Sequence, residues 1–204
     1  LPMVFAVLFA DLLERAVRER TVLKPLGFLL CAFAVVGAVG FSIGAFSTPF
    51  SGGATGYGYF CMNLNSLYNP VSCSGILWSR ALPARAQGLG SYDGFNYLGL
   101  GMLIAFPAAA VLYLCTRGWR EAARLLRRYF GLLFVSICLS LFAVSSTLLL
   151  GDRVLLSVRL PVRLVQLCTI FRSSGRMFYP VYYLMMLFVI VVLSRQGKKY
   201  LGAV

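Results

Sequence analysis

Long uninterrupted apolar runs are the feature of this sequence that most restricts its fold. Four of them approach the roughly 20 residues that an α-helix needs to cross about 30 Å of hydrocarbon. They are Pro25 to Phe46, Asn96 to Thr116, Tyr129 to Leu150 and Phe178 to Ser194. Only 12% of the 204 residues are charged and 60% are hydrophobic, which leaves too little polar surface for a soluble globule. The sequence therefore predicts an all-α fold, a polytopic transmembrane helix bundle with four complete spans.

A fifth apolar stretch, Leu1 to Ala10, is too short to cross a membrane and begins without methionine. We interpret it as the truncated end of a longer helix. The chain is then expected to be the C-terminal part of a larger protein, with residues 1–204 forming a single transmembrane helical domain. A cleaved signal peptide is the rival interpretation, but the stretch lacks a basic n-region and a small-residue cleavage site.

The net charge of +13 comes mainly from short basic blocks that flank the apolar runs. Twelve of the nineteen basic residues lie in Asp11 to Lys24, Arg117 to Arg128 and Arg195 to Lys199. Such blocks are typical of cytoplasmic loops, so membrane topology explains the charge and no nucleic-acid partner is predicted. The loops Ser47 to Phe95 and Gly151 to Met177 are then expected on the periplasmic or extracellular side of a bacterial inner membrane. Seven arginines remain in these two loops, more than topology requires.

Two cysteines of the first outer loop, Cys61 and Cys73, could form a disulfide in an oxidising compartment, and the sequence leaves this open. The chain has no histidine and no CxxC spacing. No metal site and no cofactor are therefore predicted, although a divalent cation is not excluded.

The first outer loop carries no charge between Ser47 and Arg80 but is rich in aromatic and amide side chains. Its aromatic residues fit either a membrane-interface belt or a platform for a sugar ring. They are Tyr57, Tyr59, Phe60 and Tyr68. Its amides can bind hydroxyl groups or form turns. They belong to Asn63, Asn65 and Asn69.

The end of that loop places a lone carboxylate, Asp93, directly outside the second predicted span. Asn96 and Tyr97 follow at the mouth of the span. Asp93 could cap the helix expected to begin near Phe95, since aspartate is favoured at helix N-termini. It could instead orient a substrate hydroxyl or pair with an outer arginine and join the two loops.

The second outer loop contains two pairs of arginines spaced four apart, which would share a helical face. The pairs are Arg159 with Arg163 and Arg172 with Arg176. The segment FRSSGRMFYP gathers Arg172, Ser173, Ser174 and Arg176 before the last span. Guanidinium and hydroxyl groups suit a phosphate or pyrophosphate, and Arg163 is a further candidate. Arginines reaching lipid headgroups are the alternative.

Three segments resemble a bacterial membrane family, domain of unknown function 6311, which is similar to the GT-C glycosyltransferases. The segments are GYGYFCMNL at Gly56 to Leu64, YDGFNYLGLG at Tyr92 to Gly101 and FRSSGRMFYPVYY at Phe171 to Tyr183. The resemblance implies an enzyme of the cell envelope that takes a polyprenyl-phosphate sugar at the outer membrane face.

In that case Arg172 and Arg176 would stabilise the departing phosphate, and Tyr59, Asn63, Asp93, Asn96 and Tyr97 would line the substrate loop. The general base of such enzymes usually lies in an earlier outer loop, so no catalytic residue is predicted here. Membrane lipid is the expected partner. A non-catalytic lipid or polysaccharide transport or scaffold protein is the alternative function.

Overall fold

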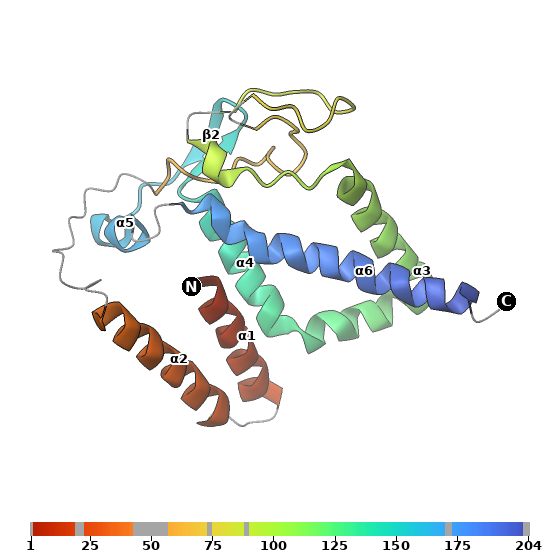
Figure 1. Cartoon of the computed structure of the whole chain (residues 1–204), viewed down its shortest axis with the longest axis horizontal. Helices are drawn as coiled ribbons and strands as arrows, with labels where there is room; N and C mark the ends of the chain where they lie inside the picture. Colours follow the sequence, from red (N-terminus) through yellow and green to blue (C-terminus); the bar gives the residue numbers. More distant parts are fainter. Residues whose placement is uncertain are drawn as a thin grey trace. The chain divides into compact units, whose positions relative to one another are not determined.

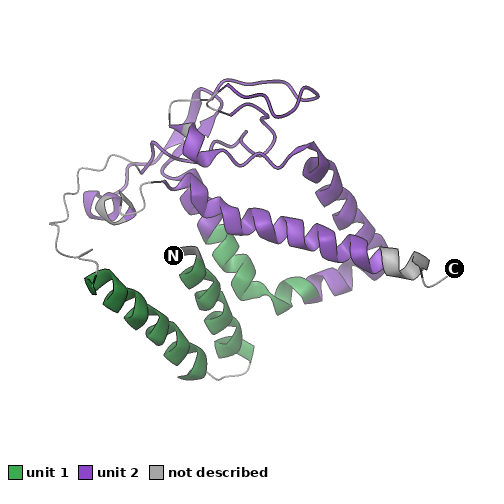
Figure 2. Cartoon of the chain, viewed as in Figure 1, with its two compact units in different colours: residues 1–53, 125–138 green, residues 54–124, 139–204 purple. Residues whose placement is uncertain are grey.

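The computed structural model describes residues 2–18, 23–42, 57–72, 75–87, 90–169 and 173–201. Its elements are mainly helical, with one short hairpin (Figure 1). The chain divides into two compact units, residues 1–53 with 125–138 and residues 54–124 with 139–204 (Figure 2). Helices α3 (Leu100–Arg128) and α4 (Phe130–Val144) each run from one unit into the other. The single domain expected from sequence stays a prediction.

In the first unit, α1 (Pro2–Arg18) packs against the beginning of α4. A Cβ added at Gly131 would lie 2.6 Å from the carbonyl oxygen of Ala10, so only glycine permits this approach. One turn further along α1, the Glu14 carboxylate accepts a hydrogen bond from the Leu132 N–H at 3.3 Å. A carboxylate there satisfies a backbone donor that the first turn of α4 leaves free and is favoured by the helix dipole.

Helix α2 (Leu23–Ser42) also lies in the first unit and is apolar on all sides. Phe5 of α1 stacks on Phe33 with ring centroids 4.0 Å apart. None of the residues of α2 is buried within the protein, and its hydrophobic side chains are largely exposed. A helix that is hydrophobic all round and has no buried residue requires an apolar solvent, as a bilayer provides.

In the second unit, α3 packs on α6 (Tyr179–Leu201). Ala109 of α3 is fully buried against Val189 and Val192, and the Phe106 ring meets the Phe188 ring edge to face at 5.8 Å. The small alanine side chain lets the two helices approach closely. Gly118 breaks the helical backbone of α3 with φ of 76°, so the basic segment after it begins a new direction.

Three helices of the described residues are long and apolar enough to cross a membrane: Leu23–Ser42, Leu100–Arg128 and Gly175–Gln196. They match three of the four predicted spans and indicate a membrane protein. Helix α4 is also apolar but has only 15 residues. At a rise of about 1.5 Å per residue it covers about 22 Å, less than the hydrocarbon thickness.

The remaining predicted span, Tyr129 to Leu150, is wrong at its C-terminal end. The backbone leaves the helix at Ser145, which has φ of 70°, and β1 (Thr147–Leu150) follows. Strand β1 pairs antiparallel with β2 (Arg153–Ser157) across a turn in which Gly151 has φ of 68°. Leucine and valine pairs across this hairpin, such as Leu149 with Val154, explain why the residues after Val144 form strands despite their hydropathy.

The remaining elements of the second unit are short. Helix α5 (Val162–Thr169) follows the hairpin. Two 3₁₀ turns, η1 (Ser91–Gly94) and η2 (Gly175–Phe178), precede α3 and α6 respectively. They lie in the segments from which the candidate residues were drawn.

Candidate functional site

The three segments that carry the family resemblance are joined by hydrogen bonds to backbone carbonyl oxygens in the second unit. The Phe60 carbonyl oxygen accepts from the Gly175 N–H at 3.0 Å and from the Ser174 hydroxyl at 3.2 Å. The Asn96 side-chain amide donates to the carbonyl oxygens of Gly94 at 3.1 Å and Gly175 at 3.2 Å. Segments far apart in the sequence therefore form one polar cluster directly before α3 and α6. We call this cluster of residues 60, 93–96 and 174–176 the junction.

Two glycines permit the close approach of these segments. A Cβ at Gly175 would lie 2.5 Å from the Cα of Gly94, and a Cβ at Gly94 would lie 2.3 Å from the Cys61 carbonyl oxygen. Backbone atoms cannot move aside as the end of a flexible side chain can. Packing therefore explains the glycines of both the YDG and the SSG sequences.

Asp93 and Arg176 form an ion pair across the same junction. The Arg176 Nη2 donates to the Asp93 Oδ1 at 2.5 Å. The Asp93 side chain is 12% exposed and that of Arg176 is 56% exposed. The interpretation of Asp93 as a helix cap is wrong, because Asp93 lies within η1 and α3 begins only at Leu100. The alternative, a carboxylate that pairs with an outer arginine and joins the two loops, matches the geometry.

The other residues considered for phosphate binding have different surroundings. The Ser174 hydroxyl is buried and bonded to Phe60, so it serves the junction. The Ser173 hydroxyl is buried and has no hydrogen-bond partner among the described residues. Arg163 is exposed on α5. Arg172 lies outside the described residues, so its expected position beside Arg176 stays a prediction.

Some of the substrate-loop candidates are buried in the fold and others are exposed. Asn96 is 3% exposed and uses its amide N–H groups for the junction, while its Oδ1 is unpartnered in the described structure. The Tyr97 hydroxyl is likewise buried without a partner there. Tyr59 is 46% exposed and meets the Phe60 ring edge to face at 4.9 Å. These residues surround the junction, and Asn63 belongs to a second feature.

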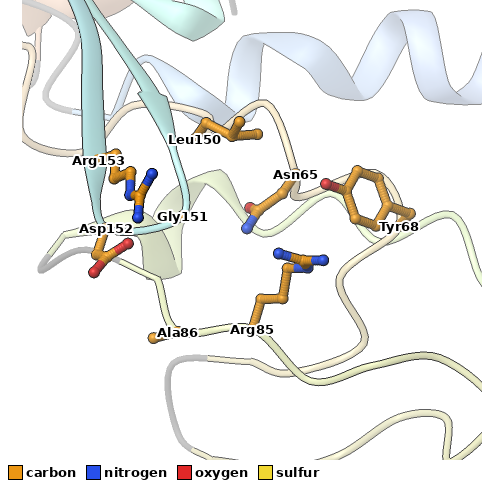
Figure 3. A pocket seen from close by; sticks show the side chains of 8 residues that line it. All are labelled: Asn65, Tyr68, Arg85, Ala86, Leu150, Gly151, Asp152 and Arg153. Atoms are coloured by element: carbon orange, nitrogen blue, oxygen red, sulfur yellow. The ribbon is translucent and has the colours of Figure 1, made fainter.

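That second feature is a pocket of about 480 Å³ between the loop that precedes α3, at residues 65–86, and the hairpin turn (Figure 3). Both walls belong to the second unit. The loop contributes one wall and the turn between β1 and β2 contributes the other. The lining residues are Asn65, Tyr68, Arg85, Ala86, Leu150, Gly151, Asp152 and Arg153.

Two buried asparagines hold the walls of this pocket in place. The Asn63 Nδ2 donates to the Gly151 carbonyl oxygen at 2.6 Å, and the Gly151 N–H donates to the Asn63 Oδ1 at 3.0 Å. The Asn69 Nδ2 donates to the Arg85 carbonyl oxygen at 2.8 Å, and the Arg85 N–H donates to the Asn69 Oδ1 at 3.2 Å. Each amide therefore satisfies one donor and one acceptor of a distant backbone, as a strand partner would.

Asn65, between these two, is used differently. It is 1% exposed, yet neither its Nδ2 nor its Oδ1 has a hydrogen-bond partner in the described structure. Burial of an unpaired polar group costs about 1–3 kcal/mol. In Figure 3 the side chains of Asn65 and Arg85 extend toward each other across the pocket. The protein therefore maintains an unsatisfied amide in the lining of this pocket.

Charge in the pocket comes from Arg85, Asp152 and Arg153, all exposed. None of the three side chains forms an ion pair with another described residue. The described residues also contain no group of three or more histidine, cysteine, aspartate or glutamate side chains placed to hold a metal ion. Two guanidinium groups and one carboxylate favour an anion that also has hydroxyl groups.

Sequence reasoning listed Asn63 as a candidate but did not select the residues that line the pocket. A partial signal was present, because Arg85 and Arg153 belong to the arginines that exceed what membrane topology requires. Tyr68 was considered for either an interface belt or a sugar platform, and Asn65 for either hydroxyl binding or a turn. This signal was insufficient to identify the pocket, because its two walls come from distant parts of the sequence. Asn63 and Gly151, which hold the walls together, are 88 residues apart.

One of the two cysteines considered for a disulfide, Cys61, lies in the described structure. Cys61 is fully buried with a free thiol, and burial raises its pKa. Its proposed partner, Cys73, lies outside the described residues.

Comparison with known proteins yields one family. The sequence pattern of the family described as Domain of unknown function (DUF6311) matches residues 1–204. No curated protein and no solved structure matches the chain.

Proposed function

The chain belongs to the DUF6311 family, and from that premise we propose that it is part of a membrane glycosyltransferase of the GT-C kind. It would handle a lipid-phosphate-linked sugar at the outer face of a bacterial inner membrane during synthesis of a cell-envelope glycan. Four membrane crossings, with both polar loops on the outer side, belong to this proposal.

The observation that carries the proposal is the position of Arg176. Its guanidinium lies beside η1 in the turn directly before α6, at the point where an apolar helix long enough to cross the membrane begins. In a bilayer, lipid phosphate groups lie near the ends of helices that cross the membrane. The Asp93 pair uses the Nη2 of Arg176, and the half-exposed guanidinium retains other N–H donors for a phosphate oxygen.

In the proposed reaction an acceptor hydroxyl attacks the anomeric carbon of the sugar. The bond from that carbon to the phosphate oxygen breaks, and the phosphate leaves with the electron pair while the acceptor proton passes to a base. Arg176 stabilises the negative charge on the departing phosphate. Asp93 orients Arg176 through the ion pair and acts as a positioning residue, because its carboxylate is engaged with the guanidinium.

A second function, a non-catalytic transport or scaffold protein for lipid-linked glycans, is favoured by the same ion pair. Asp93 is the only carboxylate among the described residues of the junction, and it is engaged with Arg176. Such a protein would bind the lipid-linked sugar but would not transfer it.

The proposal is tested with the full chain in lipid nanodiscs and a photoreactive polyprenyl-phosphate glucose. We expect Arg176→Ala to reduce crosslinking about tenfold or more, since a charge-assisted contact to phosphate contributes about 1.5–3 kcal/mol. Asp93→Asn should reduce crosslinking less. Arg80 is an exposed arginine of the loop that contains Asp93, and Arg80→Ala should leave crosslinking unchanged.

Unchanged crosslinking of Arg176→Ala at normal protein abundance would overturn the proposal. Transfer of labelled glucose to an acceptor in membranes containing the wild-type chain, and its loss in Arg176→Ala, would support the enzyme. Crosslinking without transfer in the intact membranes would favour the scaffold.

A further inference from the structure

We propose that the pocket between the first outer loop and the hairpin turn binds one sugar residue that bears a single anionic group. This site shares no lining residue with the Asp93–Arg176 junction. The inference therefore stands without the glycosyl transfer proposed above, because it requires only that the sugar binds.

The first step of the argument is the contrast among three buried asparagines of one short segment. Asn63 and Asn69 are fully buried and each exchanges two hydrogen bonds with a distant backbone. Asn65 is equally buried, lines the pocket and makes no side-chain hydrogen bond with described residues. A primary amide offers both donors and an acceptor, which matches the vicinal hydroxyl groups of a sugar ring. A bound ligand would supply the partners that the fold withholds.

The second step is the charge of the pocket. Arg85 and Arg153 come from opposite walls, and neither is neutralised by a carboxylate of the described residues. Guanidinium groups bind carboxylates and phosphates through paired N–H donors. Asp152 provides one carboxylate, which accepts hydrogen bonds from hydroxyl groups. The two guanidinium groups outnumber this carboxylate, so the pocket favours a ligand with one anionic group and several hydroxyls.

The third step is shape. Tyr68 is 38% exposed at the edge of the pocket, and an aromatic ring offers an apolar face for the C–H groups of a pyranose beside a polar hydroxyl. A volume of about 480 Å³ lies within the range of about 300–1,000 Å³ typical of small-molecule sites.

The shared chemistry is a hydroxylated ring with one anion, which a sugar phosphate and a uronic acid both provide. The test titrates the full chain in nanodiscs, at constant ionic strength, with glucose 1-phosphate, glucuronate, neutral glucose and inorganic phosphate. We expect one of the two anionic sugars to bind at least about tenfold more tightly than both glucose and inorganic phosphate. The preferred anionic sugar identifies the anion.

Variants assign the binding to the pocket. Asn65→Ala and Arg85→Ala should each weaken the preferred anionic sugar about tenfold or more. Arg80→Ala is the matched control, because Arg80 is an exposed arginine of the same loop outside the pocket lining, and it should bind as the wild type does. Asn65→Ala should unfold at no lower temperature than the wild type, since it removes no hydrogen bond that the described structure contains.

Three results would overturn the inference. The first is the absence of binding of both anionic sugars at about 10 mM, the weakest affinity that a specific pocket would show. Inorganic phosphate or glucose that binds as tightly as the anionic sugars is the second. Equal weakening by Arg80→Ala and Arg85→Ala is the third, because it would reflect general surface charge.

Discussion

The amide of Asn63 exchanges two hydrogen bonds with the backbone of Gly151, 88 residues further along the chain. The two hydrogen bonds attach the hairpin turn, which lines the pocket, to the loop that contains Asn63. This contact is the clearest case in which a side chain of the loop replaces a strand partner.

Substitution of Asn63 should therefore destabilise the second unit. Asn63→Ala removes the hydrogen-bond partner of both the N–H and the carbonyl of the half-buried Gly151, so we expect a loss of about 2–4 kcal/mol in the free energy of unfolding. Thermal unfolding in detergent, followed by circular dichroism, measures the effect. Asn65→Ala is the control, because that amide has no partner in the described structure. Equal destabilisation by both variants would contradict the different roles assigned to them.

Gly175→Ala should separate the two segments that meet at the junction. The new methyl group would lie 2.5 Å from the Cα of Gly94, and overpacking of this kind costs about 1–3 kcal/mol. Gly101→Ala is the matched control, since nothing lies within 4 Å of its added Cβ and alanine favours a helix. We expect Gly175→Ala to unfold at a lower temperature than the wild type and Gly101→Ala to be unchanged or more stable. The reverse order would refute the packing at the junction.

The buried thiol of Cys61 should make stability depend on alkaline pH. Burial raises its pKa above the ordinary value of 9.0, so the folded state holds the proton more firmly than the unfolded state does. Its contribution is fully present below pH 9.0 and is lost as the pH rises through the higher folded-state pKa.

The measurement compares unfolding temperatures near neutral pH and above the ordinary thiol pKa. The wild type should lose more stability on this change than Cys61→Ala does. Burial likewise raises the pKa of Tyr57, so Cys61→Ala should retain part of the alkaline loss. Identical losses in the wild type and in Cys61→Ala would mean that the thiol is not buried in solution.

Membrane orientation is tested by labelling on either side of α4. Arg120 precedes α4 and Arg153 follows it. In a cysteine-free background, Arg153→Cys should react with an impermeant maleimide in intact cells, whereas Arg120→Cys should react only after permeabilisation. Labelling of both positions from one side would mean that the 15-residue α4 does not cross. Labelling of Arg153→Cys only from the cytosol would remove Arg176 from the outer face.

Much of the fold follows from local sequence properties. The runs that became α2, α3 and α6 were predicted with boundaries within a few residues at their N-terminal ends, because apolar length alone decides membrane compatibility. The end of the Tyr129 to Leu150 run was wrong, since hydropathy does not distinguish a membrane helix from an apolar strand. The pairing of Leu149 with Val154 decided that segment.

The candidate residues show the same division. Sequence spacing drew attention to Asp93 and Arg176 separately but left the role of Asp93 open between a helix cap and an ion pair. The contact between η1 and η2 resolved that choice, because it brings residues 83 positions apart within hydrogen-bond distance.

By itself the sequence determined that the chain must be helical and lie in a membrane, because no other solvent accommodates such long apolar runs. It could not determine which of three nearby asparagines supports the structure and which remains free. Asn63, Asn65 and Asn69 have the same side chain and are all buried. Their roles differ only because the tertiary structure brings a distant backbone to two of them and leaves the third facing a pocket.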